Sequence, residues 1–242
     1  MTKRITKRDV IYGAVILVLI LAAAIMTVLY CTKKNDCFED MSYYDKKCAV
    51  FEAENPNFAH GQIVFIGDSI TDGCALDNYY SDLSLATYNR GIGGDVTSGV
   101  LDRLDSSVFA LEPSQVVLMI GINDINGGRS VNYVLDNYEK ILKRISEELP
   151  DTEVYCMSIL PLNEQLEEYT VINVESSTEK ILEINSRIEE LVARYGYEFV
   201  NLYPLFDDGS NRLYKEMSPD GIHLNHAGYT VWSQKLKPLL LD

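Results

Sequence analysis

Hydrophobic and polar positions follow a rhythm along the chain that predicts short buried strands separated by amphipathic helices. Apolar runs bounded by glycine, proline or asparagine predict five strands, near residues 63–66, 87–89, 116–120, 154–159 and 198–202. Between them, apolar residues spaced by three and four positions predict helices over residues 97–104, 130–149, 176–195 and 226–239. Alternating strands and helices are typical of the α/β class, with a parallel sheet covered by helices on both faces.

One segment near the N-terminus is too long and too apolar for this rhythm. Residues 10–30 contain no charged side chain, and as a helix they would extend about 30 Å, the thickness of a bilayer core. Four basic residues precede this segment, whereas acidic residues soon follow it. This charge bias predicts a single-pass anchor in the cell membrane, with the N-terminus in the cytoplasm and the rest outside. A cleaved signal peptide is the alternative, since Ala22 and Ala24 offer a small-x-small site.

The remaining chain is predicted to be one domain. We expect a cytoplasmic basic tail over residues 1–9, a transmembrane signal-anchor over 10–30, a stalk and lead-in segment over 31–60, and the globular domain over 61–242. Residues 161–178 form a long link between a strand and a helix, which predicts part of a substrate rim.

The amino-acid composition argues against some classes of binding partner and site. Of the 242 residues, 47% are hydrophobic and 24% charged, which is typical of a folded domain. The formal net charge of −15 would repel phosphate backbones, so nucleic acid is not an expected partner. None of the five cysteines forms a Cys-x-x-Cys pair, which argues against a zinc knuckle or a redox dithiol. A Cys37–Cys48 disulfide is compatible with an outside location, and ordinary thiols are the alternative.

Polar side chains follow the predicted strands at the edge where parallel sheets bind ligands. The loops 67–70, 91–95 and 121–124 follow the first three strands, and 220–223 precedes the last helix. A serine nucleophile needs a base, and the base needs an acid that fixes its tautomer. Ser69, His223 and Asp220 supply these three groups. Backbone N–H groups of Ser69 and Gly94, with the amide of Asn123, would stabilise an oxyanion.

Three further carboxylates flank these positions. Asp68, Asp95 and Asp124 each lie next to a candidate catalytic residue. We expect them to hydrogen-bond the loop backbone and support the site without taking part in the chemistry.

Each motif has an alternative when it is taken alone. Ser69 or Asp68 could be a helix cap, the glycines of 91–94 a turn or a phosphate cradle, and Asn123-Asp124 a turn pair. Asp220, His223 and His226 could hold a metal. A metal would leave Ser69 and Asn123 without a role, so no metal is expected. The presence of all four motifs, in this order along the chain and at one edge of the sheet, favours a serine hydrolase.

In this order the motifs resemble the four signature blocks of the SGNH hydrolases, the GDSL lipase/acylhydrolase family, over about residues 62–239. Ser69 matches the family nucleophile, Gly94 and Asn123 match the oxyanion hole, and Asp220 and His223 match the terminal D-x-x-H. Residues 89–104 are similar to the platelet-activating-factor acetylhydrolase branch. The resemblance implies a flavodoxin-like three-layer sandwich, a five-stranded parallel sheet of order 2-1-3-4-5, and no cofactor. Ile70 departs slightly from the family, which often has leucine there.

The function expected from these features is a membrane-anchored, extracytoplasmic serine esterase. The resemblance implies short acyl groups, acetyl foremost, on a small-molecule or glycan ester. An O-acyltransferase of the same fold is an alternative, because it would use the same residues with a sugar hydroxyl as acceptor. A catalytically silent glycan-binding protein is the other alternative. The sequence identifies no protein partner.

Overall fold

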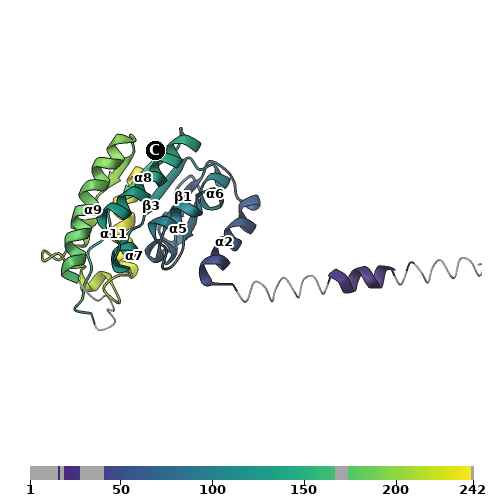
Figure 1. The fold of residues 1–242 in the computed structure, drawn as a ribbon, viewed down its shortest axis with the longest axis horizontal. Coiled ribbons are helices and arrows are strands. Elements are labelled where there is room, and N and C mark those ends of the chain that lie inside the picture. Colours follow the sequence, from purple (N-terminus) through teal and green to yellow (C-terminus); the bar gives the residue numbers. More distant parts are fainter. Residues whose placement is uncertain (1–15, 17–18, 28–40, 167–173, 241–242) are drawn as a thin grey trace, which may run out of the picture. The chain divides into compact units, whose positions relative to one another are not determined.

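The structure is a computed structural model that describes residues 16, 19–27, 41–166 and 174–240 (Figure 1). The chain divides into two compact units, Met1–Lys46 and Lys47–Asp242. The second unit therefore begins earlier than residue 61, because the segment that leads into the first strand packs within it.

The second unit is built around one sheet of five parallel strands, in the order β2-β1-β3-β4-β5. The predicted strand order is confirmed. The strands are β1 (Ile63–Gly67), β2 (Thr87–Gly91), β3 (Gln115–Met119), β4 (Glu153–Met157) and β5 (Glu198–Val200). Every residue of β1 and β3 is buried, as expected for parallel strands covered on both faces. Gly67 pairs with Gly91 on one side and Met119 on the other, so the loops that follow these strands begin level with one another.

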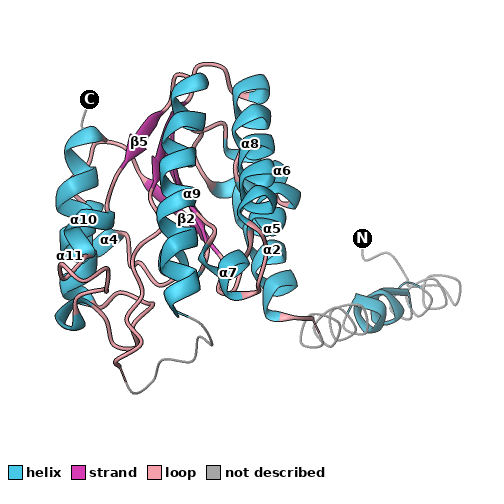
Figure 2. Cartoon of the chain, turned by 60° about the vertical axis from the view of Figure 1, so that its left-hand side comes forward, coloured by secondary structure: helices cyan, strands magenta, loops and turns pink. Residues whose placement is uncertain are grey.

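Helices cover both faces of the sheet, which confirms the three-layer arrangement (Figure 2). Even-numbered side chains of β1 and β3, such as Val64 and Leu118, face one core. That core is closed by α5 (Thr97–Asp102), α6 (Leu104–Ser107), α7 (Ile122–Asn126), α8 (Val131–Glu148) and α9 (Val174–Arg194). Odd-numbered side chains, such as Phe65 and Val117, face the other core. This second core is closed by α3 (Ser69–Asp72), α4 (Asp77–Tyr80), α10 (Tyr203–Phe206) and α11 (His226–Leu236).

The helix boundaries differ from the prediction in three main places. The helix predicted over residues 226–239 ends at Leu236 and is followed by a 3-10 turn, Lys237–Leu239. The helix predicted over residues 97–104 is interrupted at Arg103, whose backbone leaves the helical region at φ −104° and ψ 10°. The buried guanidinium of Arg103 binds carbonyls at the ends of β1 and β2, and α6 starts at the next residue. Helix α9 begins at Val174, two residues before its predicted start. Of the predicted rim, residues 161–166 are described, and residues 167–173 lie outside the described residues.

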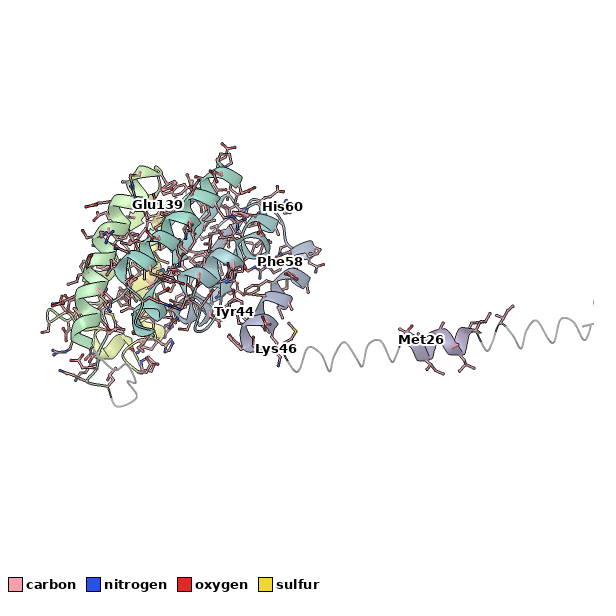
Figure 3. All side chains as sticks on the ribbon, in the orientation of Figure 1. Met26, Tyr44, Lys46, Phe58, His60 and Glu139 are labelled. Atoms are coloured by element: carbon pink, nitrogen blue, oxygen red, sulfur yellow. The ribbon has the colours of Figure 1, made fainter. Side chains whose placement is uncertain are left out.

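Helix α2 (Tyr43–Glu54) and the 3-10 turn Asn55–Asn57 precede the first strand. Phe51 of α2 is buried, and Phe58 stacks on Tyr88 of β2 with ring centroids 4.2 Å apart. Figure 3 labels Phe58 and His60 in the segment between α2 and β1. Three other 3-10 turns cover Phe109–Leu111, Lys215–Met217 and Lys237–Leu239.

Within the residues that the structure describes, no helix is long and apolar enough to cross a membrane. Only residue 16 and residues 19–27 of the predicted span are described, and these are helical. The rest of the span lies outside the described residues, as does Cys37, so the predicted disulfide with Cys48 stays a prediction.

Candidate active site

The nucleophile candidate lies where β1 passes into α3. Asp68 precedes the helix and its Oδ1 accepts a hydrogen bond from the backbone N–H of Ile70 at 3.0 Å. Asp68 therefore caps α3, and Ser69 follows as the first helical residue. Because the cap is supplied by its neighbour, the hydroxyl of Ser69 is available for another partner.

The turn at Ser69 depends on a close approach between the end of β1 and its neighbours. A Cβ atom on Gly67 would lie 2.2 Å from the carbonyl oxygen of Met119 and 2.4 Å from Oγ1 of Thr71. No real side chain tolerates such distances, so only glycine lets α3 begin this close to the sheet. The strand end thereby fixes the position of Ser69.

Ser69, His223 and Asp220 form one chain of hydrogen bonds. The distance from Ser69 Oγ to His223 Nε2 is 2.9 Å, and that from His223 Nδ1 to Asp220 Oδ2 is 2.5 Å. An ionised carboxylate can only accept, so Nδ1 carries the proton and Nε2 is left as an acceptor for the serine hydroxyl. This arrangement can deprotonate Ser69 during attack on an acyl carbon.

The loop that carries Asp220 keeps this carboxylate ionised. Burial by itself would raise the pKa of Asp220, but the His223 side chain and two backbone N–H groups outweigh it and lower that pKa. The two backbone donors, from Ile222 and His223, reach Oδ1 at 3.0 and 2.8 Å. Oδ2 is therefore directed to the His223 ring, which holds the imidazole in one orientation.

The loops after β2 and β3 bring Gly94 and Asn123 to the same edge as Ser69. Gly94 has a φ of +79°, a conformation that glycine adopts without strain, and a Cβ there would meet no atom within 4 Å. Asn123 Nδ2 donates one hydrogen bond to the carbonyl oxygen of Asp95 at 2.9 Å. An amide nitrogen carries two hydrogens, so the second remains for an oxyanion.

Reciprocal hydrogen bonds join these two loops into one block. Asp95 accepts from Asn123, and Asp124 accepts from both the backbone N–H and the hydroxyl of Thr97, each at 2.8 Å. Asn137 of α8 adds a bond to the same hydroxyl at 3.2 Å. These bonds therefore connect the loop that contains Gly94 to the loop that contains Asn123.

The side chain of Arg103 also helps to hold these two loops in place. Its buried guanidinium donates to the Asp95 carboxylate at 2.8 Å. Further bonds reach the carbonyls of Arg90 and Gly67, at 2.7 and 3.0 Å, and the Ser107 hydroxyl at 3.1 Å. One side chain thus connects the ends of β1 and β2 with the residue that follows Gly94.

An apolar pocket lies beside the candidate triad. Its volume is about 10 Å³, close to the room that one water-sized group needs. The lining includes Asp68 and Ile70, on either side of Ser69, together with Ile122 and Ile222, which precede Asn123 and His223. The walls beyond these are the side chains of Met119, Ile120, Ile159, Leu160, Pro161 and Leu162.

The carboxyl of Asp68 is in an unusual electrostatic environment. Burial raises its pKa to about 7, Asp95 adds to this rise, and the hydrogen bond from Ile70 partly opposes it. Burial likewise raises the pKa of Asp95 and Asp124, although Arg103 and Thr97 respectively oppose these shifts. The site therefore collects three buried carboxyls close to Ser69.

Asp68 should make the protein less stable as the pH rises. Its pKa is near 3.8 in the unfolded chain and about 7 in the fold, so the stability that the neutral form supplies is lost between these values. Relative to Asp68→Asn, the free energy of unfolding of the wild type should fall by up to about 4 kcal/mol from pH 4 to pH 7. Urea unfolding across this range measures the difference. Asp151→Asn, at an exposed carboxyl, is the control, and parallel curves for all three proteins would contradict the expectation.

The remaining histidines lie apart from this arrangement. His226 Nδ1 is 2.9 Å from the hydroxyl of Tyr79, and His60 is 3.2 Å from Glu112. Among the residues that the structure describes, no group of three or more His, Cys, Asp or Glu side chains is placed to hold a metal. His223 directs both ring nitrogens to Asp220 and Ser69, which removes it from the metal alternative.

Sequence reasoning missed several residues that shape the site. Asp72 accepts a hydrogen bond from the N–H of Gly93, and Thr97 links the two oxyanion loops. Arg103 was part of the motif that resembles the acetylhydrolase branch, but nothing in the pattern indicated its buried contacts. Of these residues, Thr97 gives the weakest signal in the sequence, because a threonine at the start of a helix is ordinarily a helix cap.

Comparisons with known proteins show which family this chain is similar to. A family model of the GDSL-like lipase/acylhydrolase family matches residues 65–231. The acetylxylan esterase of Geobacillus stearothermophilus is 24% identical, over 70% of this chain and 89% of the esterase. The alpha2 subunit of platelet-activating factor acetylhydrolase IB from Gallus gallus is 29% identical, over 43% of this chain and 45% of that subunit.

A solved structure from Streptococcus pneumoniae, described as a proposed platelet activating factor, has the same fold. It is 33% identical to this chain with a TM-score of 0.76, and the match covers 90% of this chain and 99% of that one.

Proposed function

This chain belongs to the GDSL-like lipase/acylhydrolase family and is a serine ester hydrolase, and from this premise we propose that Ser69, His223 and Asp220 are its catalytic triad. The observation that carries the proposal is the continuous chain of hydrogen bonds from Ser69 Oγ through His223 to Asp220.

In the proposed reaction, Ser69 Oγ attacks the ester carbonyl while His223 Nε2 takes its proton. His223 then delivers this proton to the departing alcohol, and Asp220 stabilises the imidazolium in between. Water, deprotonated by the same histidine, releases the acyl group and restores Ser69. Through both halves the oxyanion would be bound by the N–H groups of Ser69 and Gly94 and the amide of Asn123.

The acyl group is proposed to be short, with acetyl the best fit. The residues on either side of Ser69 line a small apolar pocket, whose volume of about 10 Å³ favours a methyl over a longer chain. The walls are mainly isoleucine and leucine, so they would accept the methyl without an unpaired polar atom. An acetylxylan esterase among the relatives makes an acetylated glycan a reasonable source of the ester.

We place the reaction outside the cell as part of the same proposal. The support is the uncharged stretch of residues 10–30 and the four basic residues before it, which favour a cytoplasmic N-terminus. Protease added to sealed cells should digest the C-terminal domain without permeabilisation. Protection that is lost only on permeabilisation would contradict the outside location.

The proposed function is tested with the full chain in detergent, without added metal. A fluorophosphonate that reacts with activated serines should stop hydrolysis of p-nitrophenyl acetate, and its mass should be found on the peptide that contains Ser69. Turnover should fall from acetyl to butyryl to octanoyl esters. Labelling of another serine, or activity that survives complete labelling, would refute the assignment. Acetyl transfer to an added sugar in preference to water would instead indicate the acyltransferase.

A further inference from the structure

Helix α2 lies outside the residues that the family model matches. Its side chains are nevertheless linked, through other residues, to the loop that contains Gly94. The match begins at residue 65, whereas α2 ends at Glu54. From Lys47 onward α2 belongs to the same compact unit as the sheet. Two of its charged side chains, Lys47 and Glu54, reach residues that hold the loop containing Gly94.

The first connection runs from Lys47 through Asp72 to Gly93. Lys47 Nζ is 2.7 Å from Asp72 Oδ1, while Asp72 Oδ2 accepts the backbone N–H of Gly93 at 3.1 Å. The Lys47 and Asp72 side chains are 27% and 18% exposed, so water competes only partly for the pair. One carboxylate thus joins the ammonium of α2 to the peptide that directly precedes Gly94.

The second connection fixes the other end of α2. Arg90 is buried with its guanidinium 2.8 Å from Glu54 and 3.0 Å from Asn55, and 4.5 Å from the centre of the Phe51 ring. The carbonyl oxygen of Arg90 accepts from Arg103, which also binds Asp95. Because Arg90 holds the C-terminal part of α2, Lys47 extends toward Asp72 from a helix that is attached to the sheet.

We propose that Lys47 is a positioning residue for the oxyanion hole, acting through Asp72 on the Gly93–Gly94 peptide. The inference rests on the proposed function of the site. Two adjacent glycines give this loop great backbone freedom, and Gly94 occupies a left-handed conformation. The ammonium of Lys47 holds the Asp72 carboxylate beside Gly93, and its loss would let the carboxylate turn toward water and weaken the bond from the Gly93 N–H. The Gly94 donor would then be ordered only when substrate binds.

The test replaces Lys47 by methionine and by arginine in the full chain. Lys47→Met should lower kcat for p-nitrophenyl acetate about tenfold and leave KM unchanged, because the misplaced donor acts mainly in the transition state. Lys47→Arg should recover most of kcat. The control is Lys237→Met, since Lys237 is also 27% exposed and also 2.7 Å from a carboxylate, that of Asp82. It should keep wild-type kcat.

A second measurement does not depend on activity. Amide hydrogen exchange in the peptide that covers residues 91–95 should be several-fold faster in Lys47→Met than in the wild type or in Lys237→Met. In a double-mutant cycle, Lys47→Met should add little to the loss of kcat caused by Asp72→Ala, because the proposed effect of the lysine on the loop passes through that carboxylate.

The outcomes separate this inference from the proposed function. If the wild type hydrolyses the ester and Lys47→Met matches it in both kcat and exchange, the role of Lys47 is refuted and the triad stands. If the wild type is inactive, the proposed function fails, and exchange alone decides whether Lys47 orders the loop. Equal losses in Lys47→Met and Lys237→Met would mean a general effect of charge and would also overturn the inference.

Discussion

Ser69→Ala is expected to lower kcat for acetyl esters by about 10⁴-fold or more, because no other group can form the acyl-enzyme. Binding of the ester should be nearly unchanged, since the substitution removes one oxygen and adds no bulk. The fold should also be unchanged, because Asp68 and not Ser69 caps α3. Initial rates with p-nitrophenyl acetate, at saturating substrate, measure the loss.

Ser146→Ala is the matched control for this substitution. Ser146 is a half-buried residue of α8, and its hydroxyl donates a hydrogen bond to the Lys143 carbonyl within the same helix. We expect wild-type turnover from this variant and an unfolding midpoint shared by all three proteins. If Ser69→Ala retained substantial turnover, a water or another nucleophile would have to attack the ester directly, and the triad would be wrong.

Asn123→Ala should produce the second largest loss, about 10²–10³-fold in kcat with little change in KM. The substitution removes the side-chain donor that would meet the negative oxygen, and it leaves the Asp95 carbonyl without its partner. Asn123→Asp should be at least as damaging, because it conserves shape but replaces the N–H groups by acceptors. Steady-state kinetics of the three proteins separate the two parameters.

Asn126→Ala controls for the loss of an amide in the same short helix. Asn126 is the exposed last residue of α7, so its substitution should leave kcat at the wild-type value. A rise in KM at constant kcat in Asn123→Ala would instead mean that Asn123 binds the ground state, which would exclude the proposed oxyanion role.

The strands were predictable because their signal is local. Buried parallel strands such as β1 and β3 read as continuous apolar runs, and the predicted and observed bounds agree within a residue or two. The strand order came from the resemblance to a family, since hydrophobic runs alone do not say which strands are neighbours. The helix break at Arg103 was missed because an inward arginine looks like any surface arginine in a helical pattern.

The candidate catalytic residues were predictable because each lies in a short motif beside a strand or helix end. Their supports were harder to foresee. Asp72 contacts Lys47, which is 25 residues away, and Thr97 contacts Asp124, which is 27 residues away. Polar contacts of this range have no period in the sequence and depend on how strand ends are stacked. Motifs therefore identify the chemistry, whereas the tertiary fold determines how firmly it is held.

The position of Arg103 also bears on the order in which the molecule assembles. Its guanidinium satisfies carbonyls at the ends of two strands, a carboxylate in a loop and a hydroxyl one helical turn away. These partners are far apart in the sequence, so they come together only after the long-range contacts between Gly67 and Ser107 have formed. During refolding, the sheet could therefore form before the loop at Gly94 reaches its native conformation. Recovered secondary structure would precede recovered catalysis, and the chain would be inactive in the interval.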